Sequence, residues 1–211
     1  MTEAFYDDAY FARFLDGGAA NHKFYFEDFV APDTVVADFG CAGGWLLAAI
    51  NCAKRIGVEI NPRGREFAKR QFGLDVYPDL ESLSSGSADV VISNHALEHV
   101  IDPPRILRET LRVLKPRGRA VFVVPSESVL SGFKANDPDQ HLYTWSPANL
   151  GNLFQACGFK VIECKPLVYR WPPKPDLVRK LFGPRGFHLL GRLWGMIYLK
   201  MSQVRIVAEK P

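Results

Sequence analysis

Short apolar runs alternate along this chain with amphipathic segments, which is the pattern of strands and helices that follow one another. The apolar runs that fit strands lie near residues 35–39, 55–60, 74–77, 88–93, 118–124, 159–169 and 203–208. The segments that fit helices lie near residues 44–52, 62–72, 102–114 and 146–156. Several strands are nearly continuous runs of Val, Ile and Phe, as expected for parallel strands covered on both faces. The alternation predicts a doubly wound α/β sheet with ligands at the carboxyl ends of its strands.

Proline and glycine residues mark the ends of the predicted helices. Prolines stand in the first turns of three of them, at positions 62, 103 or 104, and 147. A proline costs nothing there, because the N–H group that it lacks has no partner inside the helix. Gly118 and Gly158 are expected to stop the helices that precede them.

The first predicted strand ends in a turn with almost no side-chain bulk, which runs from Asp38 to Gly44. Its glycines tolerate positive φ and have no Cβ atoms to keep a ligand at a distance. Free N–H groups at the start of the following helix would favour polar or anionic ligand groups. Glu59 follows at the end of the second strand, where its carboxylate can accept hydrogen bonds from both hydroxyls of a ribose. A turn of this kind can also be only a tight turn, so the residues downstream decide the interpretation.

Three downstream segments extend the pattern. Residues 88–100 form a strand that leads into Asn94-His95-Ala96-Leu97-Glu98-His99-Val100, residues 107–118 end in Leu-Lys-Pro-Arg-Gly, and residues 119–125 form another apolar run. With the glycine loop and Glu59, this series resembles class I S-adenosylmethionine-dependent methyltransferases, in particular small-molecule enzymes of the type 11 and type 23 groups, over roughly residues 33–165. The resemblance implies a Rossmann-like seven-stranded sheet, mostly parallel, whose last strand is antiparallel.

The resemblance also implies that S-adenosylmethionine is the methyl donor and S-adenosylhomocysteine the product. Asp38 would order the loop and approach the methionine ammonium group, although it could also be only a turn former. The backbone along the loop would line the methionine and the ribose, at Gly40, Cys41, Ala42 and Gly44.

Further cofactor contacts are implied at the ends of the next three strands. Glu59 would hold the ribose hydroxyls, and Ile60 would pack on the adenine face unless it belongs to the core. Asp79 and Leu80 would reach the adenine edge. Asn94 and His95 would flank the methionine near the sulfonium, so the implied site spans four strand ends: those at Asp38, Glu59, Asp79 and Asn94.

Two departures leave alternatives open. A nicotinamide-dependent dehydrogenase would carry glycine at the three positions that Gly40, Ala42 and Trp45 occupy here, and an indole at the third of them counts against that class. Ala42 also departs from the methyltransferase pattern, in which glycine is usual, so it puts cofactor affinity in question. The remaining alternative is a protein that keeps this fold and binds a partner or a lipid without methyl transfer.

Methyl transfer from a sulfonium depends chiefly on holding the acceptor atom in line with the methyl carbon. A general base helps when the acceptor is a hydroxyl. The candidate bases are His95, Glu98, His99 and His141. We take His95 and His141 as the catalytic candidates, although His141 could also make only a structural hydrogen bond, and we expect Glu98 and His99 to be structural. Because the chain has no paired carboxylates, HxH or CxxC pattern, we expect no metal. We expect O-methylation of a small-molecule, lipid or glycan acceptor.

Composition fits one domain over residues 1–211, with an N-terminal helical cap over 1–32. A formal net charge of +3 is too small to predict a nucleic-acid partner. The four cysteines show no CxxC spacing and Met1–Asp8 lacks the features of a signal peptide, which together predict a cytoplasmic location. Oligomeric state is not indicated by the sequence.

The segment between the last two strands, residues 171–200, is predicted to be a helical insertion that caps the substrate site. It is expected to form two short helices on either side of residues 183–186, at the carboxyl edge of the sheet. Residues 174–200 hold six basic residues against Asp176, a net charge of +5. Such a segment suits an apolar or anionic acceptor and could make peripheral contact with a membrane. Alternatively, the helices merely shield the sheet and solvate their charges.

Overall fold

The computed structural model describes residues 18–127, 132–133, 135, 137, 139–169, 172–197 and 202–211. Seven strands form one sheet: β1 (Val35–Phe39), β2 (Lys54–Val58), β3 (Asp75–Tyr77), β4 (Ala88–Asn94), β5 (Leu114–Ser126), β6 (Lys160–Val168) and β7 (Ser202–Glu209). The helices are η2 (Gly18–Tyr25), η3 (Glu27–Phe29), α2 (Trp45–Ala49), α3 (Pro62–Phe72), η4 (Leu97–His99), α4 (Pro103–Val113), α5 (Pro147–Ala156) and α6 (Pro175–Ile197). Parts of the predicted N-terminal cap and of the predicted insertion lie outside the described residues, and the division of the chain into these parts stays a prediction.

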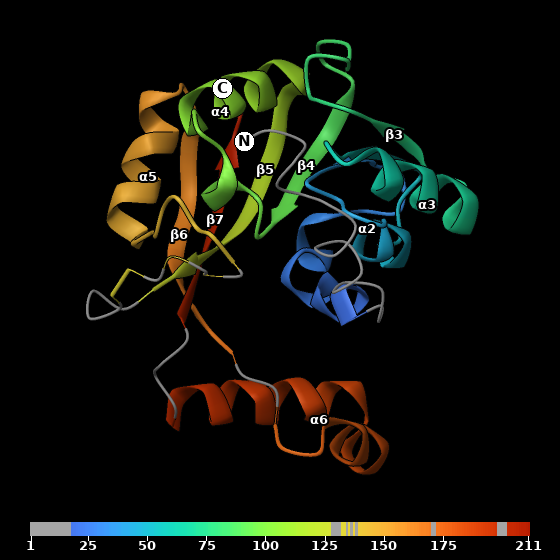
Figure 1. Cartoon of the computed structure of the whole chain (residues 1–211), viewed down its shortest axis with the longest axis vertical. Coiled ribbons are helices and arrows are strands. Elements are labelled where there is room, and N and C mark those ends of the chain that lie inside the picture. Colours follow the sequence, from blue (N-terminus) through green and yellow to red (C-terminus); the bar gives the residue numbers. More distant parts are fainter. Residues whose placement is uncertain are drawn as a thin grey trace.

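The sheet confirms the predicted fold class (Figure 1). Its strand order is β3-β2-β1-β4-β5-β7-β6. The first five strands pair in parallel, and β7 lies antiparallel between β5 and β6. Strand β6 therefore runs in the predicted direction, although its neighbour is the reversed β7. Ser202 pairs with both Ser126 and Val168, so the connection from β6 to β7 leaves the sheet at the carboxyl edge, as predicted.

Helices cover both faces of the sheet and give the domain two apolar layers. One layer joins α4 and α5 to the sheet and contains Leu107, Phe122 and Phe154, each 0% exposed. In it the rings of Phe122 and Phe154 meet edge to face at 5.5 Å. The other layer packs η2, α2 and α3 on the opposite face and includes Phe26 and Leu47. Burying one such side chain contributes about 1.5–3 kcal/mol, so the parallel strands are held by apolar contacts on both faces.

Local sequence explains where most helices begin and end. The side chain of Asn61 accepts hydrogen bonds from the first turn of α3, which ends at Gly73 with φ 66°. Ser146 and Asn149 form a reciprocal capping box at the start of α5, and Gly158 follows that helix with φ 97°. Both caps satisfy backbone groups that have no partner inside the helix. The predicted proline starts and the predicted stop at Gly158 are confirmed.

The predicted stop at Gly118 is wrong, because this glycine lies inside β5, which begins at Leu114. A Cβ atom at Gly118 would lie 2.9 Å from the carbonyl oxygen of Lys115 and 3.0 Å from that of Asp89. Close backbone approach therefore requires glycine here. Helix α4 ends without it, as Leu114 already has an extended conformation.

Helix α2 is five residues long and shorter than the predicted span of 44–52. Ile50 leaves the helix in an extended conformation. The guanidinium group of Arg55 donates to the carbonyl oxygens of Leu47 and Ile50, at 2.6–3.2 Å. These contacts satisfy carbonyls that a longer helix would have bonded internally, so a side chain from β2 ends the helix early.

Helix α6 consists of two helical segments that meet at Gly183, where φ is 65° and ψ is −179°. The predicted pair of helices is thereby confirmed over the described residues. Phe187 is 1% exposed in the second apolar layer, and the Tyr169 hydroxyl lies 3.0 Å from Nδ1 of His188. In Figure 1, α6 lies beyond the ends of β6 and β7. Among the helices that the structure describes, none combines the length and the apolar character needed to cross a bilayer.

Candidate active site

The loop after β1 lies at the carboxyl edge of the sheet and has an unusual backbone. Gly40, Ala42 and Gly44 have φ values of 78°, 48° and 84°. A Cβ atom at Gly40 would lie 2.4 Å from Cβ of Ala96, so the loop packs closely against the segment that follows β4. Glycine permits this approach and this backbone at position 40. The loop and the end of β4 therefore form one continuous surface.

Several amide groups of this loop already have partners inside the protein. The amides of Gly40 and Cys41 donate to the carbonyl oxygen of Val58, at 2.9 and 3.1 Å. The amide of Gly44 donates to the carbonyl oxygen of Cys41 at 2.8 Å. These three amides are therefore engaged within the protein, and the expected free N–H groups at the start of α2, which begins at Trp45, stay a prediction. A helix as short as α2 adds little dipole, because that field grows with aligned peptide units.

Glu59 connects the loop to the end of β2. Its Oε2 accepts from the amide of Ala42 at 2.8 Å, and its Oε1 accepts from the amide of Asn61 at 2.7 Å. Burial raises the pKa of this carboxyl, and the two amides partly counteract that rise. Each carboxylate oxygen has a second lone pair. Glu59 can therefore hold the loop and still accept hydrogen bonds from a ligand.

Asp38, at the inner end of the loop, has no comparable support. Its side chain is 1% exposed, and neither of its oxygens hydrogen bonds to any residue that the structure describes. Burial, followed by the nearby charge of Glu59, raises the pKa of Asp38 to about 8. An unpartnered buried carboxyl is costly, and a cationic ligand group would offset that cost. Asp38 therefore fits the role of partner to an ammonium group.

The residues predicted to contact adenine differ in how accessible they are to a ligand. Ile60 follows β2 and is 37% exposed, so an aromatic base could pack against it. Oδ1 of Asp79 accepts from the amide and the hydroxyl of Ser82, at 2.8 and 2.6 Å. Leu80 is 1% exposed, and its carbonyl accepts from Arg112 at 2.8 Å. Asp79 and Leu80 lie after β3 as predicted, but both are engaged within the protein, so their adenine roles stay predictions.

Asn94 ends β4 next to the loop, and His95 follows it. The amide of His95 donates to the carbonyl oxygen of Val123 at 2.9 Å, and His95 has a φ of 54°. Nδ2 of Asn94 lies 3.3 Å from Nδ1 of His22 in η2, while its Oδ1 lacks a partner among the described residues. Burial and then the nearby His22 and His141 lower the pKa of His95 to about 4. His95 is therefore neutral at pH 7.

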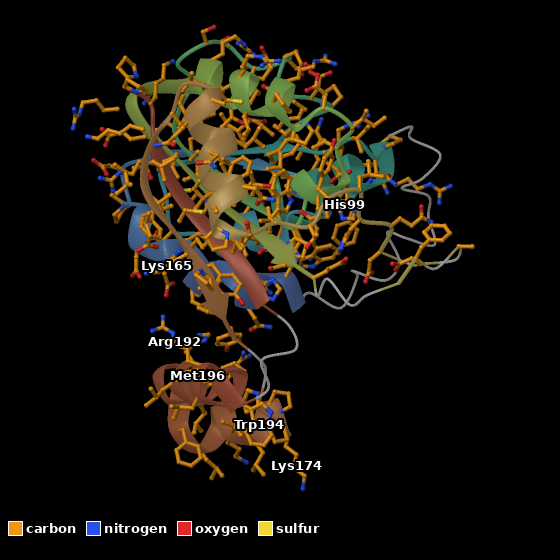
Figure 2. All side chains as sticks on the ribbon, turned by 90° about the vertical axis from the view of Figure 1, so that its left-hand side faces the viewer. His99, Lys165, Lys174, Arg192, Trp194 and Met196 are labelled. Carbon is orange, nitrogen blue, oxygen red and sulfur yellow. The ribbon has the colours of Figure 1, made fainter. Side chains whose placement is uncertain are left out.

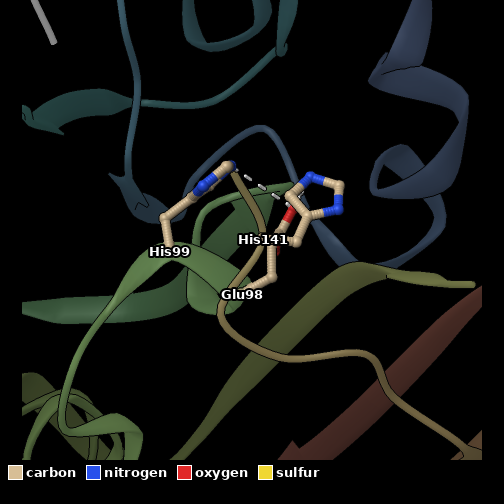
Figure 3. Close-up of side chains that lie close together, drawn as sticks. All are labelled: Glu98, His99 and His141. Carbon is tan, nitrogen blue, oxygen red and sulfur yellow. Dashed lines mark ion pairs between the residues drawn. The ribbon is translucent and has the colours of Figure 1, made fainter. Parts of the chain in front are cut away.

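Both predicted catalytic histidines meet at Glu98. Nδ1 of His95 lies 3.5 Å from Oε1 of Glu98, and Nε2 of His141 lies 4.0 Å from the same oxygen. His99 also faces this oxygen, with its Nε2 at 3.8 Å. Figure 3 shows the two imidazole rings of His99 and His141 on either side of the Glu98 carboxylate.

Sequence reasoning treated Glu98 and His99 as structural and missed this cluster. Glu98 is 0% exposed, and its two oxygens have no hydrogen-bond partner among the described residues. Burial raises its pKa to about 8. A usable signal existed, because Glu98-His99 and His141 both follow strands that end at the carboxyl edge. Only the fold shows that the two segments touch.

Comparison with known proteins finds methyltransferases. A family model described as a methyltransferase domain matches residues 11–164. A ubiquinone biosynthesis O-methyltransferase of Idiomarina loihiensis is 30% identical over 124 residues, which cover 53% of this chain and 51% of that protein. The match thus spans about half the length of this relative.

Solved structures share the fold. An S-adenosylmethionine-dependent methyltransferase of Thermotoga maritima has a TM-score of 0.68 at 21% identity, covering 99% of this chain and 97% of its own. A phosphoethanolamine N-methyltransferase of Haemonchus contortus, in complex with S-adenosylhomocysteine, has a TM-score of 0.64 at 14% identity, covering 100% of this chain and 60% of its own. At such identities the likeness shows the fold alone.

Proposed function

The chain belongs to the class I S-adenosylmethionine-dependent methyltransferase family, and we propose that it transfers a methyl group from S-adenosylmethionine to a hydroxyl oxygen of a small-molecule, lipid or glycan acceptor. The observation that carries the proposal is the unpartnered carboxyl of Asp38, buried at the glycine loop beside Glu59. S-adenosylmethionine offers an ammonium group and a ribose, which match these two carboxyl groups.

The residues around the loop divide the binding of the cofactor between them. Asp38 would pair with the ammonium group, Glu59 would accept from the ribose hydroxyls, and Ile60 would cover one face of the adenine. When bound, S-adenosylmethionine supplies a methyl carbon whose bond to sulfur breaks as the acceptor oxygen attacks, leaving S-adenosylhomocysteine. The protein's main task is then to hold the acceptor in line with that carbon.

His95 is suited to orienting the acceptor. It is neutral at pH 7, so one of its ring nitrogens can accept a hydrogen bond from an acceptor hydroxyl. With a pKa of about 4, however, it holds a proton only weakly. A base works best when its pKa lies near the working pH. We therefore assign His95 the role of positioning the hydroxyl rather than of keeping its proton.

An oxygen acceptor is supported by the relative from Idiomarina loihiensis, which is named an O-methyltransferase. The alternative is a protein that keeps the fold without methyl transfer. Calorimetry with S-adenosylmethionine, followed by transfer of a radiolabelled methyl group to a panel of phenols, sugars and lipids, separates the two. We expect micromolar binding and labelling of at least one hydroxyl compound. An absence of binding at millimolar concentration would contradict the proposal.

The α6 insertion supports a proposal about the acceptor side. Arg179 of α6 donates to Oδ1 of Asn21 at 2.9 Å, and the adjacent His22 lies 3.3 Å from Asn94. A chain of contacts therefore connects α6 to the predicted methionine end of the cofactor site. Figure 2 shows Lys174, Arg192, Trp194 and Met196 together on this helical extension, well separated from His99.

We propose that α6 docks on an anionic lipid surface that presents the acceptor. Its exposed apolar side chains include Leu181 and Phe182, at 66% and 60% exposed. Exposed basic side chains accompany them at Lys174, Lys180 and Arg192. Apolar side chains inserted at a lipid interface and cations facing anionic headgroups reinforce each other.

Sedimentation with phosphatidylcholine vesicles, with and without phosphatidylglycerol, tests this docking. We expect binding that requires the anionic lipid and that falls at least about tenfold in a Leu181→Glu, Phe182→Glu variant, because each buried side chain contributes roughly 1.5–3 kcal/mol. Ile162→Glu is the matched control, since Ile162 is 52% exposed on β6. Failure of the intact protein to bind anionic vesicles would remove the membrane role and leave the methyltransferase proposal untouched.

A further inference from the structure

The cluster of Glu98, His99 and His141 combines one carboxylate with two imidazoles in one place. One potential ligand atom from each residue lies within 4.8 Å of the other two. The rings of His99 and His141 are 5.0 Å apart and inclined at 65°. The two imidazole rings lie close to Oε1 of Glu98, as Figure 3 shows.

We propose that Glu98, His99 and His141 bind a divalent transition-metal ion, with zinc as the reference ion. Two histidines and one carboxylate form a common open zinc site, and the same donor set also serves iron(II). The sequence predicted no metal, because the familiar ligand spacings are missing when one ligand lies so far along the chain from the other two.

The carboxylate of Glu98 supports the proposal independently. It is fully buried, and the protein offers it no hydrogen bond among the described residues, although three imidazoles stand 3.5–4.0 Å away. These separations are too long for hydrogen bonds. A buried carboxylate in that position needs a positive partner, and a metal ion between it and the rings would supply one.

The outer side of the cluster also matches a metal centre. Nδ1 of His141 lies 2.5 Å from Oε1 of Glu127, while its Nε2 faces Glu98. The ring of His99 hydrogen bonds to the backbone of Gln140. In His141 the nitrogen that does not face Glu98 is therefore engaged, as is typical of metal-binding histidines, and this contact fixes the ring and its tautomer.

To hold an ion, the three ligand atoms would have to move closer together than the 4.8 Å within which they now lie. Two ligands of a tetrahedral zinc, each about 2.0–2.1 Å from the ion, lie roughly 3.4 Å apart. Here the separations from Oε1 of Glu98 are 3.8 Å to His99 and 4.0 Å to His141. Binding would therefore require a rotation of the Glu98 side chain or of the two rings. Three protein ligands would leave at least one coordination position open.

The role of the ion rests on the proposed function, whereas its binding does not. An acceptor hydroxyl that occupied the open position would have a lowered pKa and would lose its proton to solvent. The resulting oxygen anion would form the new C–O bond as the S–CH₃ bond breaks, and its electron pair would stay on sulfur. His95, 3.5 Å from Glu98, would orient that oxygen.

Metal titration of the full chain tests the site without relying on activity. The protein is stripped with a chelator and titrated with Zn²⁺ against a chromophoric competitor, and with Co²⁺ to record its visible absorption. We expect one ion per chain and a Co²⁺ spectrum typical of four- or five-coordinate nitrogen and oxygen ligands. Glu98→Gln, His99→Gln and His141→Gln should each weaken Zn²⁺ binding by at least about 10- to 100-fold, and Glu127→Gln by about tenfold.

Two controls keep the result interpretable. His188 lies in α6, where its Nδ1 is in hydrogen-bond contact with the Tyr169 hydroxyl. His188→Gln should leave the Zn²⁺ affinity unchanged. Glu98→Gln should not lower the thermal stability of the metal-free protein, because it removes a buried charge without a hydrogen-bond partner. Unchanged Zn²⁺ affinity in all three cluster variants would overturn the site.

Measuring Zn²⁺ binding and methyl transfer separately distinguishes this inference from the proposed function. If Zn²⁺ binds at the cluster but no hydroxyl compound is methylated, the proposed function fails and the site stands. If the stripped protein methylates a hydroxyl compound as fast as the metal-loaded protein, the assigned role of the ion is wrong. In every variant of the cluster, S-adenosylmethionine should bind with unchanged affinity, since none of its predicted contacts is altered.

Discussion

The predicted cofactor side and the predicted acceptor side of this site are built in different ways. On the cofactor side, Asp38 and Glu59 lie at the ends of adjacent strands, and hydrogen bonds to backbone amides fix the loop between them. On the predicted acceptor side, Glu98 and His141 come from segments distant in the sequence, and the amides of Leu142 and Tyr143 join these segments by donating to the carbonyl oxygen of Glu98, at 3.0 and 3.3 Å. A family pattern can record the first arrangement, whereas the second depends on where a long connection happens to fold.

Buried carboxyl groups sharpen this comparison. Glu59 receives two amide hydrogen bonds, whereas Asp38 and Glu98 receive none from the described residues. Burial raises the pKa of both unpartnered groups to about 8. The protein itself therefore satisfies Glu59, whereas Asp38 and Glu98 lack such partners, and we have proposed a positive ligand for each. The following predictions test that distinction on the cofactor side.

Loss of Glu59 should have the largest effect on cofactor binding. Glu59→Ala removes the predicted ribose contact and also frees the amides of Ala42 and Asn61. Hydrogen bonds to a charged group contribute about 1.5–3 kcal/mol each, so we expect at least a hundredfold increase in the Kd for S-adenosylmethionine by calorimetry. Circular dichroism should show an unchanged fold. An unchanged Kd would show that Glu59 is not a cofactor ligand.

Replacing Asp38 should weaken cofactor binding by an intermediate amount. The same change should raise the stability of the protein. Asp38→Asn removes the predicted partner of the ammonium group, so Kd should rise by about 10- to 30-fold. The raised pKa means that the native carboxyl favours its proton; its contribution to stability is full below the unfolded pKa of 3.8 and is lost as the pH rises through about 8. The variant should therefore unfold at a higher temperature than the wild type at pH 8. A lower melting temperature there would contradict an unpartnered Asp38.

The pH dependence of binding tests the same carboxyl without a mutation. If the ammonium group pairs with ionised Asp38, binding must remove the proton that Asp38 holds below about pH 8. Affinity should then rise with pH by up to about tenfold per unit between pH 6 and 7.5. It should level off near pH 8, because an α-amino group itself loses its proton at about 7.7–8.0. The dependence on Asp38 should vanish in Asp38→Asn. A flat profile in the wild type would argue against this pairing.

Sequence patterns predicted the sheet because each element carried its own signals. The apolar runs of β1, β4 and β5, the proline starts and Gly158 all act within a few residues. Where the prediction failed, a distant contact was responsible. Arg55 ends α2 early from the next strand, and Gly118 is required by the carbonyl oxygen of Asp89 as well as by its own neighbours.

The candidate site divides along the same line. The loop from Gly40 to Gly44 and Glu59 were named from the sequence, and the structure places them together. Glu98 and His99 are expected to be structural from the sequence, because it places them and His141 at the same edge of the sheet without showing that they touch. Burial of Asp38 without a partner could not be foreseen either, since a side chain's lack of hydrogen bonds is a property of the packed structure.

The smallest effect is expected at Ala42, where the predicted change in stability is a fraction of a kcal/mol. Its amide is held by Glu59, and its φ of 48° is present without any ligand. Any strain therefore exists before binding, so Ala42→Gly should act mainly on stability. A left-handed conformation costs a non-glycine residue about 1–2 kcal/mol, and glycine loses about 0.5–1 kcal/mol in entropy, so a gain of roughly 0.5 kcal/mol is expected by denaturant unfolding. The Kd for S-adenosylmethionine should change by less than about threefold.

Gly40→Ala is the contrasting variant, since its new Cβ would lie 2.4 Å from that of Ala96, and it should destabilise the fold. A marked loss of affinity in Ala42→Gly would instead mean that the methyl group packs on the cofactor.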